Sequence, residues 1–217
     1  MHGVKKFLSY FFDIFMEETS SSFNQSLKLY LSKGQYKLVT KGAIYSFGKF
    51  YLNFVETFTL LKLENRNIKK VLILGLGMGS IIQILEKKLK AAYVAIEIDP
   101  AIIELCNKYK SENFSADYIV IQENAFNYLC NQDKTYDLIC MDIFCDQLVP
   151  PEFETHDFIK ALKSSLSPKG LVIYNRLSLS ADGNLKNDQV FNIFKTYFPV
   201  ATIIKLDYNW MFVNEKI

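Results

Sequence analysis

The chain has 217 residues, of which 50% are hydrophobic and 22% are charged, and its formal net charge is +2. This composition excludes a disordered chain, and the scattered lysines give no basic stripe of the kind that binds nucleic acid. No stretch approaches the roughly 18 consecutive apolar residues of a membrane helix, so we expect no membrane partner. The four cysteines have neither C-x-x-C nor metal-ligand spacing, which predicts no metal site and reduced thiols in a cytoplasmic protein.

Residues 1–66 are predicted to form a small N-terminal unit. Residues 4–17 are expected to be a helix that packs on this protein or on a partner, because Asp13 interrupts the apolar run and no cleavage site of a signal peptide follows. Residues 27–47 contain two β-rich runs around the turn Lys33-Gly34 and a third short run, which predicts a small β-meander. A helical pattern over residues 50–63 links this unit to the rest of the chain.

Residues 67–217 alternate between strand and helix patterns. The strand candidates are residues 71–75, 93–97, 118–122, 136–142 and 170–175, and the helical patterns cover residues 80–89, 101–110, 125–132, 155–166 and 190–198. This alternation predicts an α/β fold with parallel strands and right-handed crossovers, a doubly wound Rossmann-like sheet. Two last strands, near residues 200–206 and 209–214, are separated by a short turn and must therefore pair antiparallel.

The first two strands of this domain end in residues typical of a nucleoside site. Ligands of open α/β sheets bind beyond the carboxyl ends of the strands. Gly75, Gly77 and Gly79 lead into a helix whose free amides attract a carboxylate or a phosphate, and Glu97 ends the next strand, where it can accept hydrogen bonds from ribose hydroxyls. Together they predict an adenosine-containing ligand, although the glycines also suit close packing of helix on strand. Ser80 follows Gly79 without the last glycine of the dinucleotide fingerprint, which disfavours a nicotinamide-dependent oxidoreductase.

The next three strand ends also carry polar side chains. Asn124 suits either the edge of adenine or the N-cap of the following helix. Asp142 is placed for a general base or for holding a cationic substrate. Arg176, next to Asn175, would bind an acidic acceptor or pair on the surface.

With these residues, the chain resembles the S-adenosylmethionine-dependent methyltransferase superfamily, and within it the spermidine synthase (polyamine aminopropyltransferase) group, from about Leu27 to the end. The resemblance implies a small N-terminal β-domain that often forms a homodimer, and a seven-stranded Rossmann-like sheet whose last strand is antiparallel. It implies that Glu97 binds the ribose and that the segment Asn124-Ala125-Phe126, similar to the family's Asp-Gly-Phe, contacts adenine. Asp142 falls on the family's catalytic aspartate.

The chain also departs from that group. Met78 occupies the position of the aspartate that holds the amino group of decarboxylated S-adenosylmethionine. Cys145 replaces the second aspartate of the gate loop, with Asp146 beside it as a substitute, and Tyr45 replaces a glutamine, without the acid pair that follows it in the family. Polyamines are multiply cationic because amines have pKa values of about 10. The loss of these acids therefore disfavours a polyamine substrate.

Three functions follow from these residues as hypotheses. The first is transfer of a group, foremost methyl, from S-adenosylmethionine to a small acceptor. Asp142 would be the base or the acceptor anchor, and Tyr45 and Tyr51 would face the sulfonium or pack in the core. The alternatives are a polyamine aminopropyltransferase that uses decarboxylated S-adenosylmethionine, and a non-catalytic nucleoside-binding module. We expect His156, early in the helix after the gate loop, to face solvent.

Overall fold

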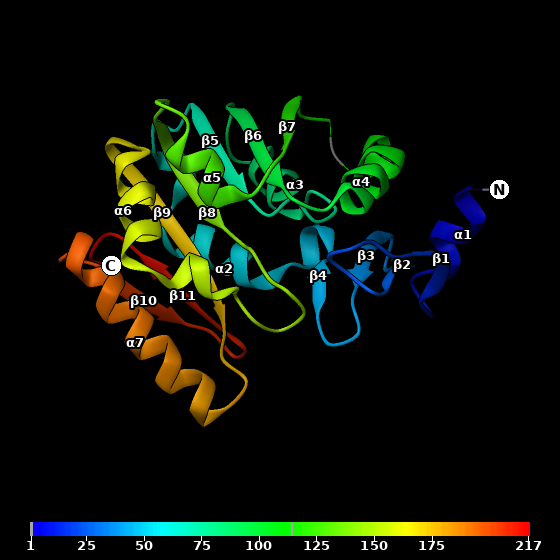
Figure 1. Cartoon of the computed structure of the whole chain (residues 1–217). Coiled ribbons are helices and arrows are strands. Elements are labelled where there is room, and N and C mark those ends of the chain that lie inside the picture. The colour runs from blue at the N-terminus through cyan, green and yellow to red at the C-terminus, as the bar shows by residue number, and fades with distance from the viewer. Residues whose placement is uncertain (1, 114) are drawn as a thin grey trace.

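A computed structural model describes residues 2–113 and 115–217 and contains two sheets (Figure 1). The N-terminal part comprises α1 (His2–Leu8), β1 (Ile14–Thr19), β2 (Leu27–Ser32), β3 (Gln35–Val39) and β4 (Ile44–Ser46). Its four strands pair antiparallel in the order β1-β2-β3-β4. The predicted meander from β2 to β4 is present, and β1 adds a strand to it.

The predicted helix over residues 4–17 is wrong, because the helix ends at Leu8 and residues 14–19 form β1. Ser9, which is buried, explains this end: its carbonyl oxygen accepts a hydrogen bond from the backbone of Lys33, and its hydroxyl accepts one from the backbone of Gly34. The chain is thereby fixed to the turn between β2 and β3 and cannot continue as a helix. Ile14 then pairs with Leu31 at the start of an antiparallel ladder.

The larger sheet has seven strands in the order β10-β11-β9-β8-β5-β6-β7. They are β5 (Lys70–Leu74), β6 (Ala92–Glu97), β7 (Tyr118–Gln122), β8 (Tyr136–Met141), β9 (Leu166–Leu177), β10 (Thr202–Lys205) and β11 (Asn209–Val213). β11 lies between β9 and β10 and is antiparallel to both, whereas the pairs among β5 to β9 are parallel. The predicted Rossmann-like sheet with an antiparallel last strand is confirmed.

β9 begins at Leu166 and not at residue 170 as predicted. Pro168 and Gly170 lie within the strand, because Tyr136 of β8 already pairs with Leu166. A register shift between Tyr136 and Leu138 accommodates the extra residues before regular pairing resumes. The preceding helix accordingly ends at Ser164.

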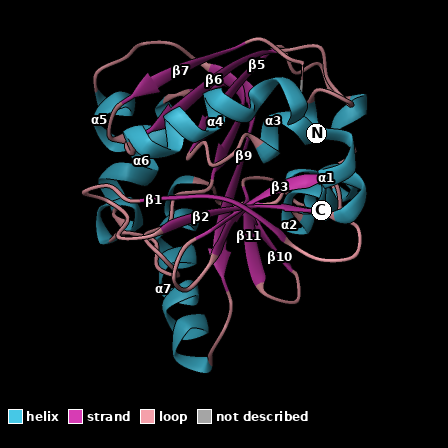
Figure 2. Cartoon of the chain, turned by 90° about the vertical axis from the view of Figure 1, so that its right-hand side faces the viewer, coloured by secondary structure: helices cyan, strands magenta, loops and turns pink. Residues whose placement is uncertain are grey.

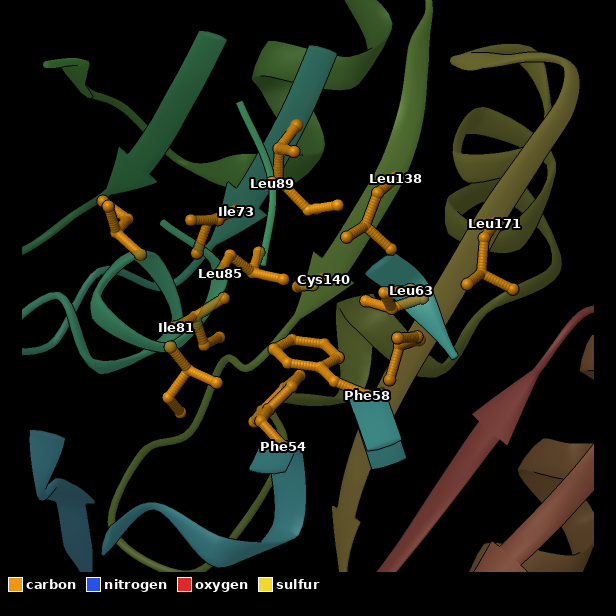
Figure 3. Close-up of a cluster of buried hydrophobic side chains, with 14 of the residues drawn as sticks. Phe54, Phe58, Leu63, Ile73, Ile81, Leu85, Leu89, Leu138, Cys140 and Leu171 are labelled. Atoms are coloured by element: carbon orange, nitrogen blue, oxygen red, sulfur yellow. The ribbon is translucent and has the colours of Figure 1, made fainter. Parts of the chain in front are cut away.

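Helices cover both faces of the large sheet. The first apolar core cluster joins one face to α2 (Leu52–Leu60), α3 (Ser80–Leu85) and α4 (Pro100–Asn113); the second joins the other face to α5 (Ala125–Cys130), α6 (His156–Ser164) and α7 (Ala181–Tyr197). Three short 3-10 helices complete the described part of the chain: η1 (Gly48–Phe50), η2 (Leu63–Asn65) and η3 (Pro151–Glu154). In Figure 3, Phe54 and Phe58 of α2 point toward Ile81 of α3 and Cys140 of β8. α2 therefore packs on the large sheet, although the sequence pattern assigned it to the N-terminal unit.

The N-terminal sheet packs on the glycine-rich turn and on α4. Its alternating residues Leu27, Leu29 and Leu31 are buried in a third apolar cluster with Met78 and Ile102. In Figure 2, β1 to β3 cross in front of the large sheet. Because Met78 and Ile102 follow the carboxyl ends of β5 and β6, the N-terminal sheet closes over the edge where open α/β sheets bind ligands. In the described part of the chain, no helix is long and apolar enough to cross a membrane.

Candidate active site

A cavity of about 300 Å³ lies beyond the carboxyl ends of β5, β6, β7 and β8. Its size is within the usual range for a small-molecule site. The cavity is lined by Phe23, Asn24, Tyr45, Gly75, Gly77, Ile96, Glu97, Ile98, Asp99, Ile102, Glu123, Asn124, Ala125, Asp142, Ile143, Phe144, Cys145, Pro150, Glu152 and Phe153. Most of the predicted site residues are thus brought together, while Gly79 and Asp146 lie outside this lining.

The glycine-rich turn allows the chain to approach itself closely. Gly75 has a positive φ of 94°, and a Cβ there would overlap the carbonyl oxygen of Asp142. Gly77, with φ 53°, lies so close to β4 that a Cβ on it would be 3.1 Å from the Cβ of Ser46. Side chains are therefore excluded by neighbouring parts of the protein itself, but these are the chain after β8 and strand β4, and not a helix packed on a strand as one interpretation proposed. Gly75 and Gly77 also line the cavity.

Glu97 is buried at the floor of the cavity and is held by backbone amides. Its Oε2 accepts a hydrogen bond from the amide of Leu76 and its Oε1 accepts one from the amide of Asp99, each at 3.0 Å. Burial raises the pKa of this carboxyl above its usual value, and the amide bonds oppose the rise. Because each carboxylate oxygen can accept more than one hydrogen bond, capacity remains for the hydroxyls of a ribose.

The loop before β2 contributes residues that the sequence analysis missed. Asp99 is completely buried, and its Oδ2 accepts hydrogen bonds from the hydroxyl of Ser21 at 2.6 Å and from Nδ2 of Asn24 at 2.7 Å. Phe23 and Asn24 are thereby brought into the cavity wall. No local sequence pattern indicates this position of Asn24, since its partner Asp99 lies 75 residues further along the chain.

Asn124 is the N-cap of α5, as one of the two interpretations proposed. Its Oδ1 accepts hydrogen bonds from the amides of Phe126 at 2.9 Å and Asn127 at 3.2 Å. Its Nδ2 donates to Oε1 of Glu152 at 2.9 Å. The side-chain oxygen of Asn124 is therefore occupied by the amides of α5. Of the two side chains Asn124 and Glu152, it is Glu152 that can still accept a hydrogen bond from the amino group of adenine.

Asp142 is held at the end of β8 by two neutral donors. Its Oδ1 accepts a hydrogen bond from Nδ2 of Asn175 at 2.8 Å, and its Oδ2 accepts one from the hydroxyl of Tyr51 at 2.9 Å. Burial raises the pKa of Asp142 to about 6, the negative charge of Glu97 adds to the rise, and the two hydrogen bonds oppose it. A carboxylate that gains and loses its proton near neutral pH suits a general base.

Tyr45 joins the N-terminal sheet to the loop that follows β8. Its hydroxyl lies 3.1 Å from Oδ1 of Asn24 and 3.2 Å from the carbonyl oxygen of Phe144, and it accepts a hydrogen bond from the amide of Asp146 at 2.7 Å. Burial raises the pKa of this phenol, which keeps it neutral. Tyr45 lines the cavity as expected, whereas Tyr51 stands behind Asp142 and is not part of the lining.

Three other expectations can be compared with the structure. Asp146 is exposed and turns away with a left-handed backbone at φ 52°, while Cys145 lines the cavity, so the carboxylate of Asp146 does not take the place of the missing acid. Arg176 forms an ion pair with Glu154 at 2.7 Å, as one of its two interpretations proposed, but its side chain is buried and not on the surface, and Arg176 does not line the cavity. His156 is exposed, as predicted.

Met78 lies in an apolar core cluster and does not line the cavity. Its side chain is 2% exposed and packs among residues of the N-terminal sheet. The family's aspartate at this position is thus replaced by a core residue. Within the described residues, no group of three histidine, cysteine or acidic side chains is arranged to hold a metal ion.

The strand order, the glycine-rich turn and the acids at the strand ends define a protein of the Rossmann-like methyltransferase fold class. The chain belongs to the spermine/spermidine synthase domain family, whose sequence pattern matches residues 51–212. The resemblance to the spermidine synthase-like branch of the methyltransferases is thereby confirmed. The chain is a member of a family of transferases.

Its relatives include both methyltransferases and aminopropyltransferases. The chain is 30% identical over 174 residues to an eEF1A lysine and N-terminal methyltransferase homolog of Drosophila pseudoobscura pseudoobscura, an alignment that covers 75% of this chain and 25% of the fly protein. It is 27% identical over 136 residues to a polyamine aminopropyltransferase of Vibrio vulnificus, covering 61% of this chain and 46% of the relative. The chain therefore spans less than half of either relative.

Solved structures share the fold. Spermidine synthase from Thermotoga maritima has a TM-score of 0.73 at 17% identity, with 92% of this chain and 72% of that chain covered. Human methyltransferase-like protein 13 in complex with SAH has a TM-score of 0.62 at 24% identity, with 76% and 81% covered.

Proposed function

We propose that this chain transfers a methyl group from S-adenosylmethionine to a small acceptor, with Asp142 as the base. The observation that carries the choice of donor is the burial of Met78. Decarboxylated S-adenosylmethionine ends in a primary ammonium, which needs an acidic partner, whereas the glycine-rich turn carries Met78, directed into the apolar core. The intact amino acid of S-adenosylmethionine has a carboxylate as well, which suits the amides of a glycine-rich turn.

The residues of the cavity fit this donor. Glu97 would accept hydrogen bonds from the ribose hydroxyls, and Ile98 and Phe153 offer apolar surface to adenine. Asn124 and Glu152 together present one donor and one acceptor to the edge of the base. The donor, when bound, supplies a methyl group attached to a positively charged sulfur. When the bond between this sulfur and the methyl carbon breaks, the sulfur becomes a neutral thioether, which is the leaving group.

Asp142 would act on the acceptor. As the lone pair of an amine or hydroxyl attacks the methyl carbon, Asp142 takes up the proton that the acceptor releases. Its pKa of about 6 leaves the carboxylate ionised at pH 7 and above. The fixed positions of the carboxylate and of the nucleoside would align the reacting atoms, which is often the major contribution to such a transfer.

Aminopropyl transfer is the second candidate, and one observation favours it. Five carboxylates line the cavity: Glu97, Asp99, Glu123, Asp142 and Glu152. An acidic cavity attracts polyamines, which are multiply cationic. Against this, Asp99 is completely buried by Ser21 and Asn24, and Glu97 is bound by backbone amides, so neither is a free partner for an amine chain.

Calorimetry with the purified chain tests the donor. We expect S-adenosylmethionine to bind at least about tenfold more tightly than its decarboxylated form, which corresponds to about 1.4 kcal/mol. Single-turnover assays with methyl-labelled donor and a panel of amines and hydroxyl compounds then test transfer. Tighter binding of the decarboxylated donor would favour aminopropyl transfer, and binding without any transfer would favour a nucleoside-binding module.

A further inference from the structure

A chain of side-chain amides runs from β11 to Asp142. Nδ2 of Asn209 donates a hydrogen bond to Oδ1 of Asn175 at 2.8 Å, and Nδ2 of Asn175 donates one to Oδ1 of Asp142, also at 2.8 Å. Asn209 opens β11, Asn175 lies on β9, and Asp142 directly follows β8, so three adjacent strands contribute to one chain of bonds.

The three side chains share one face of the sheet. Side chains alternate between the faces of a strand, so Asn175 shares the face of Ile173, and Asn209 shares that of Met211. Both Ile173 and Met211 belong to the core cluster under α2. Tyr51, directly before α2, is the last member of the network, because its hydroxyl donates a hydrogen bond to Asp142.

The hydrogen bond from Asn209 determines whether the side-chain amide of Asn175 presents its NH₂ group or its oxygen to Asp142. A carboxylate only accepts hydrogen bonds, so it needs the NH₂ end of Asn175. Asn175 is buried, with 1% of its surface exposed, and cannot exchange its partners for water. The donor from Asn209 occupies the oxygen end of the same amide and prevents a rotation that would turn this oxygen toward Asp142.

We propose that Asn209 is a positioning residue, which holds the amide of Asn175 with its donor end on Asp142 and so keeps that carboxylate ionised and aligned with the cavity. The proposal rests on the proposed role of Asp142 as the base. Asn209 does not line the cavity, and its effect is transmitted entirely through Asn175.

The ionisation of Asp142 depends on the orientation of Asn175, because few of the other groups that face Asp142 favour its charged form. The carboxylate of Glu97 opposes ionisation of Asp142 by its negative charge. The thiol of Cys140 on β8 is neutral, because burial raises its pKa. The hydroxyl of Tyr51 donates to Asp142, and that of Tyr45 lies further off; burial raises the pKa of both phenols, so both are neutral. Only Asn175 and Tyr51 therefore stabilise the ionised form among these groups.

The test replaces the donor of Asn209 by an acceptor of the same size. In Asn209→Asp, the new carboxylate attracts the NH₂ end of Asn175 and turns the amide oxygen toward Asp142, where two oxygens can meet only if Asp142 is protonated. We expect the midpoint of the Asp142 titration, followed by NMR of ¹³C-labelled carboxyl groups and assigned with Asp142→Asn, to move up by about one pH unit or more. Tyr208→Asp is the control, because this neighbouring residue is 68% exposed and adds the same charge without touching Asn175.

The uncharged variant Asn209→Leu separates orientation from charge. We expect it to lower the rate of methyl transfer in a single turnover by about tenfold through loss of alignment, while the dissociation constant of S-adenosylhomocysteine stays unchanged. If Asp142 titrates alike in Asn209→Asp and Tyr208→Asp, the proposal is overturned. If the titration moves only in Asn209→Asp but the wild-type chain transfers no methyl group, the positioning role stands and the proposed function fails.

Discussion

Tyr51 and Asp142, 91 residues apart in the chain, are joined by a hydrogen bond of 2.9 Å between the phenol and a carboxylate oxygen. Tyr51 immediately precedes α2, which is anchored in the core by the fully buried Phe54 and Phe58. The phenol is therefore held by a packed helix, and with Asn175 it leaves Asp142 bound by two neutral donors. The candidate base is thus held on the side away from the cavity, and among the described residues no cationic side chain is hydrogen-bonded to it.

The first prediction concerns turnover. Asp142→Asn removes the proton acceptor but keeps an oxygen for Asn175 and an amide that can donate to the hydroxyl of Tyr51. We expect the rate of methyl transfer to fall by about 10²- to 10⁴-fold, the usual contribution of a general base. Calorimetry should show nearly unchanged affinity for S-adenosylhomocysteine. A variant that retains full activity would remove Asp142 from the mechanism.

The same variant should be more stable than the wild type at alkaline pH. The pKa of Asp142 is about 6 in the folded chain against an ordinary 3.8, so the folded state holds this proton more tightly than the unfolded state. The stability that protonation provides is present at low pH and is lost as pH rises through the folded pKa. Asn cannot ionise, and we expect a gain on the order of 1–3 kcal/mol at pH 8 that shrinks toward about pH 4. Urea unfolding of both chains at several pH values measures this difference, and a gain independent of pH would contradict the assignment.

Much of this site follows from the sequence because it lies at strand ends. Glu97 and Asp142 directly follow apolar runs that are recognisable as buried strands, and the carboxyl ends of parallel strands meet at one edge. The alternation of strand and helix is strong enough to predict the sheet itself, including the antiparallel pairing of its last two strands.

The remaining residues depend on contacts that no local pattern specifies. Asn24 enters the cavity wall through Asp99, and Asn209 reaches Asp142 only through Asn175. The helix predicted over residues 4–17 is overridden by tertiary structure, because Ser9 binds the turn at Gly34. The position of Met78 in the core becomes visible only when the N-terminal sheet is seen to pack on the glycine-rich turn.

A third prediction tests the nucleoside site. In Glu97→Gln, the side-chain NH₂ meets the backbone amide of either Leu76 or Asp99, so one hydrogen bond is lost and the charge that ribose hydroxyls would meet disappears. We expect the affinity for S-adenosylhomocysteine to fall by about 10- to 100-fold, or about 1.4–2.8 kcal/mol. Glu104→Gln, exposed on α4, is the matched control and should bind as the wild type does. Equal affinities for the three chains would exclude Glu97 from ligand binding.

A fourth prediction separates the core role of Met78 from a role in the cavity. Met78→Asp places a carboxylate among Leu27, Leu29 and Ile102 without a cationic partner. We expect a loss of about 3 kcal/mol or more in the free energy of unfolding, whereas Met78→Leu should cost less than about 1.5 kcal/mol. Urea unfolding measures both. A stable Met78→Asp chain that binds decarboxylated S-adenosylmethionine tightly would instead show that position 78 reaches the donor site.

A fifth prediction links donor binding to protons. S-adenosylmethionine carries a positive sulfonium, which favours the ionised form of nearby Asp142, whereas the sulfur of S-adenosylhomocysteine is neutral. Since the pKa of Asp142 is about 6 in the free chain, the affinity for S-adenosylmethionine relative to S-adenosylhomocysteine should rise as pH increases through this value and then level off. An opposite charge at short range lowers the pKa of an acid by about one unit or more, so the ratio of the two dissociation constants should change by about tenfold.

The two ligands share the same ribose, adenine and amino acid, so the titration of every other group largely cancels in this ratio. Calorimetry between about pH 5 and pH 8 therefore isolates the group that senses the sulfonium. In Asp142→Asn, the ratio should be nearly independent of pH, because Asp142 is the acid proposed to face the acceptor and the sulfur, whereas Glu97 is held by backbone amides at the proposed ribose position. A wild-type ratio without pH dependence would place Asp142 away from the reacting sulfur, and an equal slope in the variant would assign the linkage to another carboxylate of the cavity lining.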